Sequence, residues 1–168
     1  QIVPARCREL ICPGSPALNT SARMATALAP DIGAYLGGDA VVGPIATDYD
    51  LVDAVQAGLP VGAVDDLLAR GVLAADEVDR LVLPRRTLSH RRARGERLTL
   101  DESDRLARVA RVLAVAEASF GSAEKAGRWL RRPSRGLRGE VPLALAVTSG
   151  GARLVEDALM RIASGDLA

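Results

Sequence analysis

The sequence predicts an all-α protein, with a helix-turn-helix module followed by a small helical domain. Of its 168 residues, 48% are hydrophobic and 26% are charged, a balance that provides enough apolar surface for a core. Only four residues are aromatic, so leucine, valine and alanine must fill that core, and this composition suits packed helices better than sheets. No segment alternates apolar and polar residues over several positions, as a half-buried strand would.

Three parts are expected along the chain, and the first is the least regular. Prolines and glycines interrupt this lead-in, which has room for one helix over 21–36 that is interrupted or kinked at Pro30. Glycines and Pro44 near its end are typical of a linker. The three expected parts are the lead-in (residues 1–45), the helix-turn-helix module (residues 46–97) and the second helical domain (residues 98–168).

Helical signals become regular from Thr47, a residue type that is favoured at helix N-caps. Apolar residues at helical spacing follow it, and again follow Pro60, until Gly71 ends the second run. A short helix comes next, then an abrupt break before Pro84, then a polar, arginine-rich helix that Gly95 closes. The module is therefore expected to contain helices over 47–59, 60–70, 74–82 and 84–94.

The second domain opens with the longest predicted helix. Thr99 and Glu102 match a capping box, in which each side chain accepts a hydrogen bond from the backbone N–H of the other residue. Apolar residues then recur on one face of that helix for about twenty residues. A glycine ends it, and Ser122 caps the next helix. A turn-rich loop over 133–139 precedes a last helix, expected over 150–163.

Positive charge is concentrated in one window of the sequence. Residues 84–97 carry six arginines against one acid, Glu96, and so a net charge of +5, although the whole chain carries only +1. The window coincides with the short helix, break and polar helix of a helix-turn-helix motif, whose second helix enters the major groove of DNA. This coincidence, and the lack of neutralising acids in the window, predict a DNA-binding surface. The alternative is an arginine-rich helix that is merely solvated.

The phase of the arginine-rich helix predicts the role of each side chain. Leu88 is its only large apolar residue and should face the core. Residues on the opposite side would face base edges, where arginine, serine and histidine can form hydrogen bonds. Arginines that flank Leu88 would reach phosphates. The base-facing candidates are Arg86, His90, Ala93 and Arg94, with Ser89 to one side, and the phosphate-facing candidates are Arg85, Arg91 and Arg92.

The sequence shows no signal for catalysis, metal binding or membrane insertion. The single histidine, His90, has no predicted acid or cysteine partner, and no nucleophile elbow, phosphate-binding loop or zinc-protease motif is present. Cys7 and Cys12 form one pair, which supplies too few ligands for a zinc site. No apolar run has the length of a membrane span, and no signal peptide is evident. We therefore expect a cytoplasmic, non-enzymatic protein without metal or cofactor.

Several stretches of the sequence are distinctive. They are GLPVGAVDDLLARG (58–71), RRTLSHRR (85–92) and LTLDESDRLARV (98–109), followed at characteristic spacings by GSAEKA, P-L-x-L and T-x-x-G-x-x-x-V-x-x-x-L-x-R-I. Together they resemble the Xre–MbcA–ParS family of antitoxins over roughly residues 46–168. The chain departs from many such helix-turn-helix motifs at the turn, where Leu83-Pro84 stands instead of a glycine-containing sequence.

The resemblance implies a protein partner and a separate binding function for each domain. The partner would be a RES-domain toxin, an enzyme that consumes NAD, and the antitoxin itself would have no activity. The C-terminal domain would bind the toxin, with its tail near the toxin's active-site cleft. The helix-turn-helix would bind operator DNA and repress the operon, either as a homo-oligomer or as a hetero-oligomer with the toxin. The candidate toxin-binding residues are Arg153, Asp157, Arg161, Ser164, Gly165, Asp166, Leu167 and Ala168.

Two other functions stay open at this stage. A helix-turn-helix transcriptional repressor without a toxin partner would use its C-terminal domain for dimerisation or for a small molecule. A helical adapter would bind no DNA at all. Steep salt dependence of DNA binding would exclude the adapter, because several arginines would then be neutralising phosphates.

Overall fold

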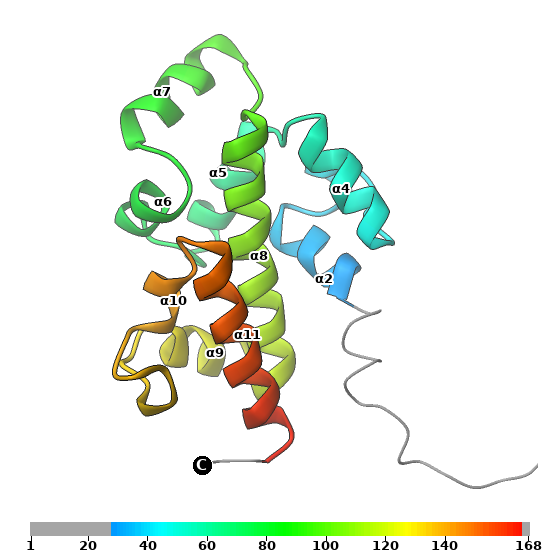
Figure 1. Cartoon of the computed structure of the whole chain (residues 1–168). Helices are drawn as coiled ribbons and strands as arrows, with labels where there is room; N and C mark the ends of the chain where they lie inside the picture. The colour runs from blue at the N-terminus through cyan, green and yellow to red at the C-terminus, as the bar shows by residue number, and fades with distance from the viewer. Residues whose placement is uncertain (1–27, 166–168) are drawn as a thin grey trace, which may run out of the picture.

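The computed structural model describes residues 28–165, and Figure 1 shows them as helices joined by loops. No strand occurs within this part of the chain, so the predicted all-α fold is confirmed. The elements in chain order are α2 (Leu28–Tyr35), α3 (Asp39–Val42), α4 (Asp48–Gln56), α5 (Val61–Ala69), α6 (Ala75–Leu81), α7 (Arg85–Arg94), α8 (Leu100–Phe120), α9 (Ala123–Leu130), the 3-10 helix η1 (Arg135–Leu137), α10 (Pro142–Leu145) and α11 (Ser149–Ala163). The predictions for Cys7, Cys12, Asp166, Leu167 and Ala168 lie outside the described residues.

Helix α8 is the centre of the fold. Thr99 Oγ1 accepts the Glu102 N–H at 3.3 Å and Glu102 Oε2 accepts the Thr99 N–H at 2.8 Å, so the predicted capping box is confirmed. Leucine, valine and alanine recur along the helix, and ten of its 21 residues are buried. These residues pack against α2, α4, α9 and α11, and they form one continuous core rather than one core for each half.

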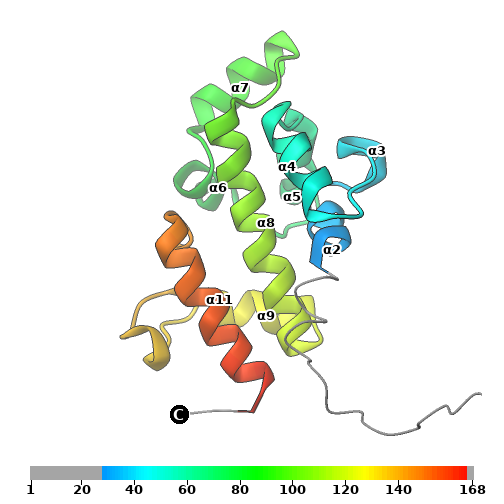
Figure 2. The same ribbon diagram turned by 45° about the vertical axis from the view of Figure 1, so that its right-hand side comes forward.

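The two ends of α8 carry different parts of the molecule. Figures 1 and 2 both show α7 at the N-terminal end of α8, and α9 with the C-terminal end of α11 at the other. A helix of 21 residues spans about 30 Å at 1.5 Å per residue. The arginine-rich helix therefore lies at one end of the protein, and α11 runs alongside α8 toward the other end.

Most helix boundaries agree with the sequence-based expectation. Thr47 caps α4 and forms a capping box with Asp50, and Ser122 caps α9 by accepting the Lys125 N–H. Gly95 ends α7 with a positive φ of 63°, a conformation that glycine adopts without steric cost. These boundaries were predictable because caps and terminating glycines act through residues that are close in sequence.

Three short elements were not predicted. Gly37 and Gly38, with φ values of 98° and 67°, turn the chain into α3 within the expected linker. The 3-10 helix η1 lies in the expected loop, and α10 begins at Pro142, where a first-turn proline sacrifices no intrahelical hydrogen bond. Pro30 lies near the start of the described part of α2, and most of the segment expected to precede it as helix lies outside the described residues.

Candidate functional site

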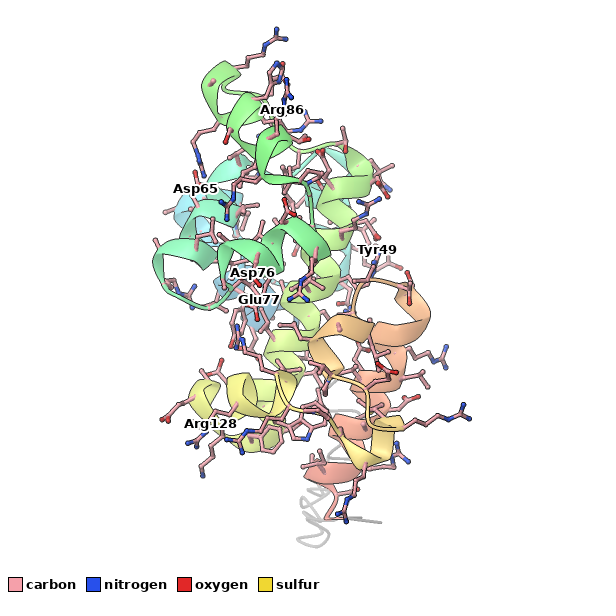
Figure 3. All side chains as sticks on the ribbon, turned by 90° about the vertical axis from the view of Figure 1, so that its left-hand side faces the viewer. Tyr49, Asp65, Asp76, Glu77, Arg86 and Arg128 are labelled. Carbon is pink, nitrogen blue, oxygen red and sulfur yellow. The ribbon has the colours of Figure 1, made fainter. Side chains whose placement is uncertain are left out.

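Helices α6 and α7 form the helix-turn-helix unit that the sequence predicts. The Leu83 N–H donates to Val78 O at 3.2 Å, and Val82 and Leu83 are buried at the turn. This buried pair, rather than a glycine, sets the tight connection before Pro84. Figure 3 shows Arg86 on α7 at one end of the molecule, far from Arg128 on α9.

The N-terminus of α7 is capped from the preceding helix. Pro84 provides no side-chain cap, but Asp79 Oδ1 on α6 accepts the Arg85 backbone N–H at 2.6 Å. A carboxylate at this position also interacts favourably with the positive end of the helix dipole. Asp79 thus joins the two helices of the motif directly, a role that its place in the sequence did not reveal.

The faces of α7 agree with the predicted helical phase. Leu88 is the one buried residue of this helix and contacts the core. On the opposite side, the predicted base-facing side chains are all exposed: Arg86, Ser89, His90 and Arg94. Among the described residues, the side chains of Arg85, Arg86 and His90 form no ion pair or hydrogen bond, so they are free to contact an anionic partner.

The other predicted phosphate contacts are engaged with acids of this chain. Arg91 is half-buried, with Nε 2.9 Å from Glu102 Oε2 and its Nη1 3.3 Å from Glu96 Oε2. Arg92 forms an exposed ion pair with Asp65 on α5, and this hydrogen-bonded carboxylate raises the pKa of Arg92. The inference that the arginines of residues 84–97 lack neutralising acids is therefore wrong for the folded protein. Asp65 and Glu102 are distant in sequence from the arginines, so a count over one window could not include them.

Helix α11 holds the described part of the predicted toxin-binding set. Val155, Ala158 and Leu159 bury one face against the rest of the protein. The opposite face is exposed and contains the predicted residues Arg153, Asp157, Arg161 and, just beyond the helix, Ser164 and Gly165.

Two exposed apolar side chains of α11 were not predicted as site residues. Leu154 is 56% exposed, and Met160 is also exposed. Leu154 lies three residues before Asp157 and seven before Arg161, so it shares their face of the helix. A helical wheel of the last helix would have found Leu154.

The start of α11 is shaped by close packing. Thr148 Oγ1 accepts the Gly151 N–H at 3.0 Å and so caps the helix. A Cβ atom at Gly151 would collide with the Leu145 carbonyl oxygen, so the α10–α11 connection requires glycine there. The glycine pair at 150–151 therefore serves helix packing at its second position.

One ion pair joins the helix-turn-helix to the second half of the chain. Glu77 on α6 is buried, and both its carboxylate oxygens accept from Arg131 at 2.7 Å. Arg131 also donates to Val72 O, while Glu77 caps α6 through the Ala74 N–H. This bidentate pair fixes the base of the helix-turn-helix against the end of α9.

Other classes of site receive no support from the described residues. Within residues 28–165, no group of three or more histidine, cysteine or acidic side chains is arranged to hold a metal ion. None of the helices in that range is both long and apolar enough to cross a membrane.

Comparison with known proteins assigns both halves of the chain. A family model described as the antitoxin Xre-like helix-turn-helix domain matches residues 50–111. A second, described as the antitoxin Xre/MbcA/ParS C-terminal toxin-binding domain, matches residues 115–165. The two matches meet inside α8, in agreement with a helix that contributes to both parts of the core.

Three curated relatives are proteins named antitoxin Xre. The relative from Pseudomonas putida is 40% identical over 121 residues, which cover 72% of this chain and 76% of the relative. The relative from Yersinia enterocolitica is 34% identical over 117 residues, or 68% of this chain and 79% of the relative. The relative from Photorhabdus laumondii is 34% identical over 110 residues, or 64% of this chain and 74% of the relative.

Proposed function

Because the chain belongs to the Xre/MbcA/ParS antitoxin family, with a helix-turn-helix domain and a toxin-binding domain, we propose that it neutralises a RES-domain toxin that consumes NAD. In this proposal the C-terminal domain binds the toxin directly, and the helix-turn-helix represses the operon. The protein itself has no enzymatic activity. Both proposed partners, the toxin and the operator, are cytoplasmic, and the protein acts there as an oligomer with or without the toxin.

The outer face of α11 is the proposed toxin-binding surface. The observation that carries this proposal is the exposed Leu154 between Asp157, Arg161 and Arg153, within the segment that matches the toxin-binding domain. Protein interfaces commonly place a few apolar anchors within a polar rim, and such anchors account for most of the binding energy. The charged residues would then determine the register of the complex, and residues 164–168 would extend toward the toxin's active site.

A matched pair of variants tests this surface. Leu154→Asp places a charge at the proposed anchor on α11, whereas Leu100→Asp places the same charge at a similarly exposed leucine (59%), the first residue of α8. Each variant is co-expressed with the neighbouring open reading frame, co-purified, and assayed for NAD consumption. We expect Leu154→Asp to release an active toxin and Leu100→Asp to keep it inactive. Equal neutralisation by both variants would contradict the proposed surface.

Deleting residues 164–168 tests the role of the tail separately. We expect weaker neutralisation of the toxin with unchanged DNA binding, because the C-terminal end of α11 and α7 lie at opposite ends of the described structure. Full neutralisation by the truncated chain would exclude the tail as the inhibitory element. A chain that binds its promoter but no neighbouring protein would instead support a repressor without a toxin partner.

The exposed arginines of α7 support operator binding. Log K for the operator should fall linearly with log salt, by about 0.9 for each phosphate contact. Arg85 is a candidate for such a contact, because its side chain forms no ion pair within residues 28–165. Binding that does not depend on salt would contradict the DNA-binding proposal.

A further inference from the structure

The side chain of Arg91 is held more firmly than any other arginine of α7. Its Nη2 donates to Glu102 Oε1 at 3.3 Å and its Nη1 donates to Arg97 O at 3.1 Å. The buried Nε lies 2.9 Å from Glu102 Oε2 but forms no hydrogen bond. Glu96 adds a further ion pair. The Arg91 side chain is 17% exposed and that of Glu102 is 12% exposed. Arg91 thus directs its charge inward, away from the exposed face of α7.

Glu102 is fixed independently of Arg91. It is the third residue of the capping box of α8, where Oε2 accepts the Thr99 N–H at 2.8 Å. The following turn packs Leu106 into the core, and Ser103 Oγ accepts the Leu59 N–H at 2.8 Å. Arg91 therefore pairs with a carboxylate whose position is also set by the capping box and by the packing at the start of α8.

The loop between α7 and α8 is also tied to the body of the protein. The Leu98 N–H donates to Leu59 O at 2.9 Å, and Arg97 Nε donates to Gly58 O at 2.6 Å. Gly58 has a φ of 82°, and a Cβ atom there would lie 2.5 Å from Leu98 O, so this approach requires glycine. The carbonyl of Arg97 that accepts from Arg91 is therefore held in place as well.

The neighbouring pair, Arg92 with Asp65, differs in its surroundings. Its side chains are 51% and 41% exposed, and a solvent-exposed ion pair of this kind contributes little to stability. The two pairs flank Leu88 on opposite sides, because positions 91 and 92 lie about 60° and 40° from position 88 around the helix in opposite directions. Of these two ion pairs, only the one formed by Arg91 is shielded enough from solvent to help orient α7.

We infer that Glu102 is a positioning residue for operator recognition, which acts through Arg91 and sets the angle at which α7 meets DNA. This inference rests on the proposed DNA-binding function. Arg91, a predicted phosphate contact, is engaged by Glu102 in this structure. Leu88 and the Asp79 cap hold the first half of α7, and the Arg91 contact holds its second half. This contact adds to the buried Val82–Leu83 turn, which sets the connection before Pro84.

The substitution Glu102→Gln tests the inference through the sign of its effect. Glutamine can still accept the Thr99 N–H, so the capping box of α8 is kept while the charge is lost. Removal of a negative charge near DNA would ordinarily strengthen binding. We expect the opposite result: the ratio of operator to non-specific affinity falls roughly 5- to 150-fold, as if one good base contact were lost. The slope of log K against log salt stays unchanged. Tighter binding with a slope steeper by about 0.9 would overturn the inference, because Arg91 would then be a phosphate contact that Glu102 restrains.

Asp65→Asn is the matched control, since it releases an arginine on the other flank of the same helix. We expect affinity for any DNA sequence to rise at low salt, with an unchanged operator-to-non-specific ratio. A loss of that ratio equal to the loss in Glu102→Gln would overturn the inference, because the two pairs would then position α7 alike.

Arg91→Lys provides a second variant, which keeps the positive charge but not the two-point contact. We expect Arg91→Lys to lower the ratio of operator to non-specific affinity as Glu102→Gln does. The slope of log K against log salt and the melting temperature of the protein should stay unchanged. Wild-type affinity and ratio in Arg91→Lys would overturn the positioning role. Absence of salt-dependent operator binding in the wild type would instead remove the proposed DNA-binding function on which the inference rests.

Discussion

Helices α7 and α11 are the two elements proposed to face macromolecular partners, and they are anchored in contrasting ways. Helix α7 buries one leucine and depends on Asp79, Glu102 and Asp65 for its remaining contacts. Helix α11 buries five residues along one face and exposes Leu154 among charges on the other. A helix that binds DNA must keep most of its surface polar, so ion pairs and an N-terminal cap hold it in place. A helix that binds protein can bury one whole face in the core.

The largest expected effect tests the apolar anchoring of α11. Leu159→Ala should lower the free energy of unfolding by about 2–5 kcal/mol, because Leu159 is fully buried and a cavity would remain. Urea denaturation measures this loss. Leu154→Ala, on the exposed face of the same helix, should change stability by no more than about 0.5 kcal/mol. Equal losses in the two variants would contradict the assignment of the two faces.

The next effect concerns the connection between the halves. Arg131→Ala should cost about 1–3 kcal/mol, since it leaves the buried Glu77 carboxylate without its charged partner. Arg132→Ala, at an exposed neighbouring position, is the control and should be nearly neutral. A stability loss in Arg131→Ala no greater than in this control would show that water replaces the ion pair without cost.

A third prediction separates the DNA-reading face from the helix that bears it. Arg86→Ala should reduce discrimination of the operator by about 1–3 kcal/mol, because Arg86 is exposed opposite Leu88 and free to contact a base. Its effect on stability should be negligible. Fluorescence anisotropy with operator and scrambled DNA measures the ratio, and an equal loss on both sequences would assign Arg86 to a phosphate instead.

The smallest effect is a pH dependence on α11. Burial raises the pKa of Glu156, with a further contribution from Asp157, while Arg111 and Arg153 oppose the shift. The folded-state pKa of Glu156 lies above the unfolded-state value of about 4.3, so the ionised side chain destabilises the fold at neutral pH. This destabilisation disappears as the pH falls from the folded-state pKa to the unfolded-state pKa. Glu156→Gln should therefore be slightly more stable than the wild type at pH 7, by a few tenths of a kcal/mol. Urea titrations should show this difference vanishing near pH 4; a difference that is constant with pH would contradict the account.

The sequence was sufficient where the determining interactions are local. Thr99 with Glu102, Thr47 with Asp50, and the terminating Gly95 all act within a few residues, so the corresponding helix ends were predicted correctly. The phase of α7 was also predictable, because a single leucine among polar residues leaves one buried orientation. The family resemblance was confirmed by matches that cover both halves of the chain.

Interactions between distant residues escaped the sequence-based prediction. The sequence predicted a phosphate contact for Arg91. Its pairing with Glu102, eleven residues away, depends on the conformation of the α7–α8 loop, which the sequence alone does not give. Glu77 and Arg131 are 54 residues apart, and nothing in their local sequences pairs them. Charge counted along a chain is thus a poor measure of charge available on a surface, since folding brings acids to the basic helix.

The central claim, that opposite ends of one helical protein serve DNA and toxin, is tested most directly by hydroxyl-radical footprinting of side chains. The protein is oxidised alone, with operator DNA, and with its co-purified toxin, and modification is quantified by mass spectrometry. The account predicts that operator protects His90 but not Leu154 or Met160, and that toxin protects Leu154 and Met160 without protecting His90. Protection of His90 by the toxin, or of α11 by DNA, would contradict the assignment of the two surfaces.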